Sequence, residues 1–291
     1  MPATITIAQH SARPLTVNRL GYGTMRLPGP DVWGEPADRA EALQILRTAE
    51  EHGVNFLDTA DYYGQDVTNR LIREALYPYP PELLICTKVG AARLPDKSWV
   101  PYNRPEQLRA SIDNNLRTLG QEQIQLVHYR VMPKSDVPLS EALGAMYEMQ
   151  REGKILHVGL SNVTREELTT GLQLGPIATV ENMYSYAQRT THRTPHFESR
   201  GGEEVLDLCE QHGIPLIPYF SLLHALPKHS EQVAEIARKH QATPAQVNIA
   251  WLLHRSPWLL PIPGTSRLAH LRENLAAAHI RLSPDDMAHL G

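Results

Sequence analysis

The chain has few cysteines, and it lacks both a long hydrophobic run and an excess of basic residues. Only Cys86 and Cys209 occur among its 291 residues, which is too few for a disulfide framework or a zinc site built from cysteines. No stretch approaches the ~20 apolar residues that a membrane-spanning helix needs. The N-terminal residues have no apolar core behind a positive start, so we expect no secretory signal and a cytoplasmic location.

The charge balance is weakly acidic. Lysine and arginine total 28 and aspartate and glutamate total 32, which gives a formal net charge of −4. Such a chain has no general attraction for nucleic acid or anionic lipid, so we expect neither as a partner. Hydrophobic residues make up 42% and charged residues 21% of the chain. These fractions are ordinary for a folded globular protein and exclude a disordered one.

Short apolar runs alternate with longer amphipathic stretches along the whole chain. The short runs are typical of strands that are buried on both faces of a parallel sheet. They lie at residues 19–25, 55–60, 83–89, 124–129, 156–161, 178–183, 214–220 and 258–264. The amphipathic stretches predict helices at residues 38–53, 68–76, 104–120, 140–153, 165–175, 203–213, 231–240, 244–255 and 268–277.

Eight strands that alternate with helices favour a (β/α)8 TIM barrel over a doubly wound sheet, the competing architecture. No shift in composition marks a linker and no repeat is evident, so we predict one domain over residues 1–291. In such barrels the site is built at the C-terminal ends of the strands, and this directs attention to polar residues there.

Four polar residues at or just after three successive runs are candidates for catalysis: Asp58, Tyr63, Lys88 and His128. Together they suit proton donation to a carbonyl group. The ordinary pKa of a tyrosine, about 10, is too high for an efficient acid near neutral pH, and a nearby ammonium lowers it. A carboxylate keeps the lysine charged, and a histidine can hydrogen-bond a carbonyl oxygen that gains negative charge. Each residue taken alone also has an ordinary structural role.

The sequence around these residues resembles the aldo-keto reductase superfamily. Five motifs carry the resemblance over nearly the whole chain, in the family's order. They are HGVNFLDTADYYG at residues 52–64, TKVG at 87–90, IQLVH at 124–128, GKILHVGLSN at 153–162 and IPGTSRLAHLREN at 262–274. A finer similarity, in RLPGPDVWGEP and YYGQDVTNRLIREAL, points to the subgroup that includes bacterial pyridoxal reductases.

This resemblance implies an NADPH-dependent reductase that converts an aldehyde or ketone to an alcohol. In that picture Tyr63 is the acid, Lys88 tunes its pKa, Asp58 holds Lys88 and His128 positions the carbonyl. The residues that the resemblance assigns to the cofactor are Ser161, Asn162, Glu181, Tyr219, Gly264, Thr265, Ser266, Arg267, Glu273 and Asn274.

Two cofactor positions depart from the family pattern. Glu181 stands where a glutamine commonly contacts the carboxamide, and glutamate lacks the amide donor. His270 stands where some members have an arginine that pairs with the 2′-phosphate, although Arg267 or Arg272 can compensate. The strength of the preference for NADPH over NADH is therefore open.

For the substrate pocket we expect aromatic walls from Trp33, Trp99 and Tyr102, which follow the first and third strands. The alternative is that these side chains anchor long loops. His192 and His196 have a proline between them and no obvious third ligand. His224 and His229 are five residues apart, which does not put them on one helix face, and a proline separates them as well, so we expect no metal.

Two other function classes stay open. Related barrels bind NADP(H) tightly and serve as redox-sensing regulatory proteins. A strand-end lysine such as Lys88 can also form a Schiff base, as in barrel lyases and aldolases. The partner we expect is a small carbonyl substrate, and the sequence does not settle the oligomeric state.

Overall fold

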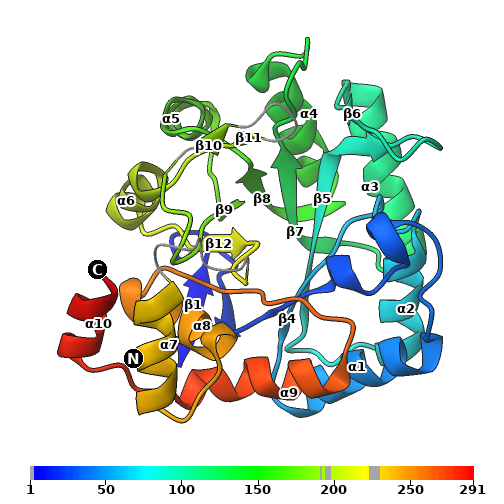
Figure 1. The fold of residues 1–291 in the computed structure, drawn as a ribbon. Coiled ribbons are helices and arrows are strands. Elements are labelled where there is room, and N and C mark those ends of the chain that lie inside the picture. The colour runs from blue at the N-terminus through cyan, green and yellow to red at the C-terminus, as the bar shows by residue number, and fades with distance from the viewer. Residues whose placement is uncertain (1–2, 191, 194–197, 223–229) are drawn as a thin grey trace.

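Seven parallel strands form the inner layer of the protein, and helices surround it (Figure 1). The structure is a computed structural model that describes residues 3–190, 192–193, 198–222 and 230–291. Each parallel strand pairs with the next one along the chain: β3 (Tyr22–Gly23), β4 (Phe56–Asp58), β5 (Leu84–Arg93), β7 (Ile124–Arg130), β8 (Ile155–Ser161), β9 (Val180–Met183) and β12 (Leu216–Tyr219).

An extended segment at residues 258–262 takes the eighth place in the ring. It is hydrogen-bonded to β12 on one side, where Leu260 N–H donates to the Leu216 carbonyl, and to Gly21 on the other, where Gly21 N–H donates to Pro261. Pro261 and Pro263 have no N–H group, so the segment cannot form a regular strand ladder. The predicted (β/α)8 barrel is therefore confirmed, with an eighth strand that proline keeps irregular.

The first nine of the outer helices lie close to the predicted ranges. They are α1 (Arg39–Glu51), α2 (Val67–Leu76), α3 (Pro105–Leu119), α4 (Leu139–Arg151), α5 (Arg165–Leu174), α6 (Glu203–His212), α7 (Ser230–Lys239), α8 (Pro244–Arg255), α9 (Leu268–Ala276) and α10 (Pro284–Leu290). Side-chain caps fix several helix starts: Thr164 is the N-cap of α5 and Thr243 is the N-cap of α8, each in a capping box. Every helix in the described part of the chain is too short or too polar to cross a lipid bilayer.

Four additions to the barrel were not predicted. Helix α10 is one. The others are antiparallel hairpins: β1 (Thr4–Ile7) with β2 (Leu15–Asn18), β6 (Trp99–Tyr102) with the end of β5, and β10 (His192–Arg193) with β11 (Glu198–Ser199). Ile5, Ile7 and Val17 of the first hairpin pack with the apolar residues inside the barrel.

Alternation along the strands decides which side chains face the barrel axis. Leu84 and Cys86 of β5 pack inside, whereas Ile85 packs outward against helices. Successive side chains of a strand point to opposite faces, so Lys88 also faces inward. By the same alternation Leu126, His128 and Arg130 of β7 face the interior. Apolar side chains fill the interior near the strand starts, and charged ones gather near the strand ends.

Candidate active site

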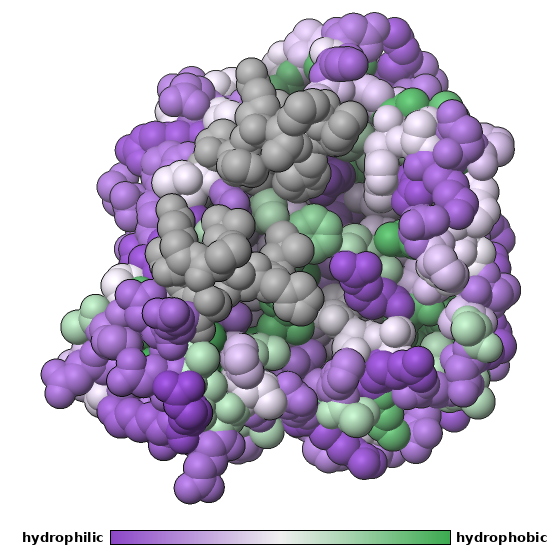
Figure 2. Space-filling model, viewed as in Figure 1, coloured by the Kyte–Doolittle hydropathy of each residue, from purple (hydrophilic) through white to green (hydrophobic). Residues whose placement is uncertain are grey.

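A cavity of about 630 Å³ opens at the C-terminal ends of the strands. Its wall contains most of the charged residues of the barrel interior: Arg26, Asp58, Lys88, Arg130 and Glu181. Aromatic and apolar side chains complete it, among them Tyr62, Tyr63, Trp99, Met132, Tyr219, Phe220 and Ile262. In the space-filling view, apolar residues (green) gather near the centre of the face shown, inside a largely hydrophilic (purple) outer zone (Figure 2).

The Lys88 ammonium lies at the centre of the charged residues. It donates a hydrogen bond of 2.5 Å to Asp58 Oδ1 and one of 3.1 Å to the Thr59 carbonyl, and it lies 3.3 Å from Glu181 Oε1. Burial by itself disfavours the charged lysine, but the two carboxylates outweigh it and hold the pKa of Lys88 well above its ordinary value. Lys88 is therefore a permanent buried cation.

Tyr63 lies beside this cation. The Lys88 Nζ atom is 5.2 Å from the centre of the Tyr63 ring, and Tyr63 is only 5% exposed. Burial raises the pKa of Tyr63 above its ordinary value, the positive charge of Lys88 opposes the rise, and Asp58 and Glu181 add to it. Tyr63 is thus a protonated hydroxyl on the cavity wall with a cation placed to stabilise its anion.

Asp58 and Glu181 share the lysine but differ in their surroundings. Burial and the nearby Glu181 charge raise the pKa of Asp58, and Lys88 only partly offsets them. Burial also raises the pKa of Glu181 by itself, but Lys88, His128 and Arg130 outweigh that effect and keep it below its ordinary value. Glu181 is consequently the more firmly ionised of the two.

His128 lies beneath the cavity rather than on its wall. It is fully buried, and both ring nitrogens have partners: Nε2 is 2.7 Å from Thr179 Oγ1, and Nδ1 is 3.1 Å from Cys86 Sγ and 3.2 Å from Glu181 Oε2. Burial lowers the pKa of His128, so the ring is neutral. The structure thus brings Asp58, Tyr63 and Lys88 together at the cavity and places His128 one layer below.

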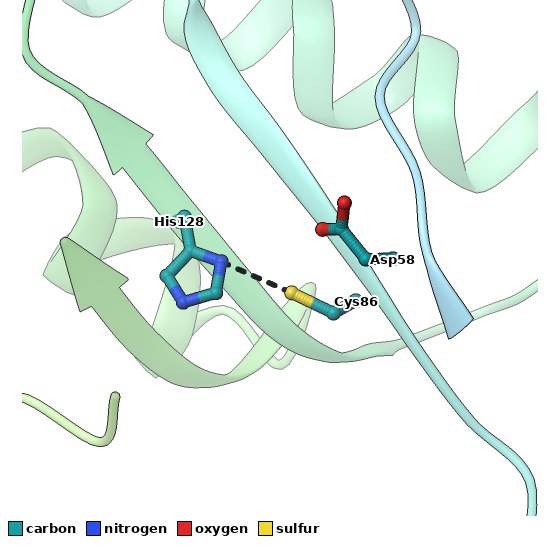
Figure 3. Close-up of side chains that lie close together, drawn as sticks. All are labelled: Asp58, Cys86 and His128. Atoms are coloured by element: carbon teal, nitrogen blue, oxygen red, sulfur yellow. Dashed lines mark hydrogen bonds between the residues drawn. The ribbon is translucent and has the colours of Figure 1, made fainter. Parts of the chain in front are cut away.

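Figure 3 shows Asp58, Cys86 and His128 together, three side chains of types that bind metals. Their nearest atoms are already in contact, since Cys86 Sγ hydrogen-bonds His128 at 3.1 Å. A tetrahedral zinc bound to both atoms would separate them to roughly 3.5 Å. Asp58 also accepts a hydrogen bond from Lys88. The three side chains are thus bonded to one another or to Lys88 in this arrangement, and they would have to move apart to bind a metal ion. Of the histidine pairs considered in the sequence, His196, His224 and His229 lie outside the described residues.

The predicted cofactor residues fall into two groups. Asn162, Glu181, Tyr219 and Gly264 line the cavity. Ser161 directly precedes Asn162 in the chain, and its buried Oγ atom has no hydrogen-bond partner among the described residues. A Cβ on Gly264 would come within 2.5 Å of the Gly23 carbonyl, so only glycine fits this close approach.

The second group lies at the start of α9 and along it. Thr265 is buried, whereas Ser266 and Arg267 are exposed. The Asn274 amide nitrogen is buried without a partner in the described part of the chain. Glu273 already accepts a hydrogen bond of 2.6 Å from the Thr243 hydroxyl. The exposed Arg267 lies 3.3 Å from Glu41 of α1.

The expected aromatic wall is formed only in part. Trp99 lines the cavity and packs edge-on against Tyr62, with 5.3 Å between the ring centres. Trp33 does not line it and instead lies 5.9 Å from Arg93, which also covers Trp99 at 4.5 Å. Tyr102 is not among the lining residues described. Trp33 therefore packs beside Arg93 and is not part of this wall.

Arg130 is the main residue of the wall that the sequence analysis missed. It lies two positions after His128 on the same inward face of β7. The predicted strand ended at Tyr129, whereas the observed strand ends at Arg130. Continuing the two-residue alternation from His128 by one step would have found it.

Comparisons with known proteins agree on one family. The model of the aldo/keto reductase family matches residues 19–291. Pyridoxine 4-dehydrogenase of Escherichia coli K12 is 42% identical over 280 residues, which cover 94% of each chain. A thermostable aldo-keto reductase crystallised with the inhibitor epalrestat matches at TM-score 0.82 with 29% identity, over 99% of this chain and 98% of that one. A Klebsiella pneumoniae aldo-keto reductase in complex with NADPH matches at TM-score 0.79 with 25% identity, over 100% and 94%.

Proposed function

The chain belongs to the aldo/keto reductase family, and we propose that it reduces an aldehyde or ketone to an alcohol with NADPH, with Tyr63 as the proton donor. Its assignment to this family of oxidoreductases agrees with the resemblance that the five motifs carry. The observation that most supports the proton donor is the buried Tyr63 hydroxyl on the wall of the cavity, beside the Lys88–Asp58 ion pair.

The residues present fit NADPH at several points. Ser161 offers a buried hydroxyl without a partner among the described residues, and Asn274 offers an amide in the same condition. Gly264 lines the cavity just before the start of α9, where the chain passes close to the Gly23 carbonyl. We assign the nicotinamide end to Ser161, Asn162, Glu181 and Tyr219 and the adenine end to Gly264, Thr265, Ser266, Arg267, Glu273 and Asn274. Bound there, NADPH supplies the hydride for the carbonyl carbon.

Tyr63 then gives its hydroxyl proton to the carbonyl oxygen, and the alcohol forms. The tyrosinate left behind is stabilised by the Lys88 ammonium, which stays charged because Asp58 and Glu181 hold it. Burial strengthens this attraction, since water does not screen it. Lys88 therefore acts by its charge, and the firmly protonated amine is a poor candidate for the Schiff base that the sequence left open.

The cavity favours a small, flat carbonyl substrate. Its volume of about 630 Å³ is partly walled by the rings of Tyr62, Tyr63 and Trp99. The E. coli relative carries the name pyridoxine 4-dehydrogenase. We therefore include pyridoxal among the candidate aldehydes. Both cysteines are free and buried, which suits a reducing compartment, and we place the activity in the cytoplasm.

The test is NADPH oxidation by purified protein with a panel of aldehydes that includes pyridoxal and a nitrobenzaldehyde. We expect turnover by the wild type and a loss of about 10²-fold or more in kcat for Tyr63→Phe, with NADPH binding retained. Tyr77→Phe, on an exposed surface tyrosine, serves as the matched control. Full turnover by Tyr63→Phe would contradict the proton donor. Tight NADPH binding without turnover of any aldehyde would favour the redox-sensing regulatory protein.

A further inference from the structure

We propose that Arg130, rather than His128, donates the hydrogen bond that stabilises the carbonyl oxygen during reduction. This inference rests on the proposed function and assigns one further residue of the same site. The side chains of Arg130 and His128 share one face of β7 at different depths.

Arg130 lies in the row of residues at the rim. In the strand register it pairs with Ser161 of β8, and Ser161 pairs with Glu181 of β9. His128 pairs with Lys88 and Gly159, one step deeper. Arg130 lines the cavity together with Tyr63, whereas His128 does not. Of the two inward-facing polar side chains of β7, only Arg130 therefore reaches the cavity where a substrate binds.

Arg130 also has an N–H donor that is not used in a hydrogen bond within the described part of the chain. Its Nε atom is buried and has no hydrogen-bond partner in the described part of the chain. The guanidinium carbon lies 5.7 Å from the centre of the Tyr219 ring, and the charge of Arg130 acts on Tyr63 and Glu181. A planar guanidinium has five N–H donors and stays charged, so it suits an oxygen that gains negative charge.

His128 lacks this freedom. Thr179, Cys86 and Glu181 already lie within contact distance of its nitrogens. The ring fits closely against β8, where a Cβ on Gly159 would lie 2.4 Å from His128 Cδ2. Turning the ring toward the cavity would break these contacts, so His128 is a positioning residue for Glu181.

The charges of Arg130 and Glu181 compensate each other. Glu181 places a second carboxylate beside Lys88, which weakens the pull of that ammonium on Tyr63. Arg130 adds a cation on the cavity wall. When hydride adds to the carbonyl carbon, the oxygen gains the electron pair of the broken π bond. Arg130 stabilises this charge with an N–H hydrogen bond while the proton arrives from Tyr63.

The experiment compares Arg130→Met with His128→Asn and with Arg151→Met, a control on an exposed arginine at the end of α4. We expect Arg130→Met to lower kcat about 100-fold, and His128→Asn to lower it less than tenfold. Benzoate, which presents an anionic oxygen, should bind the NADPH-loaded Arg130→Met at least tenfold more weakly. NADPH dissociation constants, measured by fluorescence, should change less than threefold.

Chemical rescue separates a catalytic role from a structural one. Guanidinium chloride at tens of millimolar should raise kcat of Arg130→Ala at least fivefold, and it should not raise kcat of the wild type or of Tyr63→Phe. A larger loss in His128→Asn than in Arg130→Met, or Arg130→Ala without rescue, overturns the proposal. Because the wild-type enzyme is assayed beside the variants, failure of the proposed function would show as absent wild-type turnover and is distinguished from failure of this inference.

Discussion

The Lys88 ammonium lies 2.5 Å from Asp58 Oδ1, and the carboxylate of Glu181 lies 3.3 Å from the same nitrogen. The one ammonium group thus forms ion pairs with two carboxylates, and all three side chains are at most 4% exposed. Removing one partner of a buried ion pair usually costs more stability than the pair contributes, because the remaining charge loses its compensation. Lys88, whose charge acts on the pKa of Tyr63, is therefore also expected to contribute to the stability of the barrel.

We expect Lys88→Met to abolish turnover and to lower the free energy of unfolding by about 3–5 kcal/mol, measured by urea denaturation. The double variant Asp58→Asn, Lys88→Met removes one of the stranded carboxylates. It should regain at least half of the lost stability without regaining turnover. Equal stability of the single and double variants would show that the two carboxylates do not depend on Lys88 for compensation.

The sequence predicted most of the barrel because its strands are short apolar runs and its helices have clear caps. It also predicted that Asp58, Tyr63 and Lys88 would meet at the strand ends. The depth of His128 below the cavity was harder to predict, because IQLVH fits the expected motif while the strand continues two residues further, to Arg130. A shift of two residues along a strand keeps the side chain on the same face and changes only its depth. Depth depends on the pairing register, which one sequence does not reveal.

The start of α9 shows a second feature that the motif did not reveal. Glu41 of α1 accepts a hydrogen bond of 3.0 Å from the Leu268 N–H and lies 3.3 Å from Arg267. Its carboxylate thus occupies a helix N-terminus, where backbone N–H groups favour anions. The motif residues of α9 come from the C-terminal part of the chain, and Glu41 comes from more than two hundred residues earlier. Local sequence therefore gives no signal for this contact.

We expect Glu41→Gln to tighten NADPH binding about fivefold and to change NADH binding less than twofold. The substitution removes a negative charge beside Arg267, which we assign to the adenine end of the cofactor, and only NADPH carries a 2′-phosphate there. The glutamine oxygen still accepts from Leu268, so the helix start is kept. Dissociation constants for both cofactors, from nucleotide fluorescence, are the measurement. Glu51→Gln, at the far end of α1, is the matched control. Weaker NADPH binding would instead show that Glu41 holds Arg267 in its binding position.

Asp61 is a buried carboxyl in the loop between Asp58 and Tyr63. Burial raises the pKa of Asp61 to about 7, and the Asp66 charge adds to the rise, while hydrogen bonds with Ser111 and Asn114 oppose it. Its Oδ1 atom has no hydrogen-bond partner among the described residues. The folded protein thus binds the Asp61 proton more tightly than the unfolded chain does, where the pKa is about 3.9.

A group of this kind lowers stability as the pH rises, because the folded state keeps a proton that the unfolded state has already released. The effect begins near the unfolded pKa and is complete above the folded pKa of about 7. Between about pH 5.5 and about pH 8 we expect Asp61 to lower the free energy of unfolding by about 2 kcal/mol.

The Asp61→Asn variant is neutral at every pH in this range. Its free energy of unfolding should therefore fall by about 2 kcal/mol less than that of the wild type between these two pH values. Urea denaturation at both pH values measures the difference, and Asp207→Asn, on an exposed position of α6, should keep the wild-type dependence. Equal pH dependence of Asp61→Asn and the wild type would mean that Asp61 is ionised in the folded protein throughout this range.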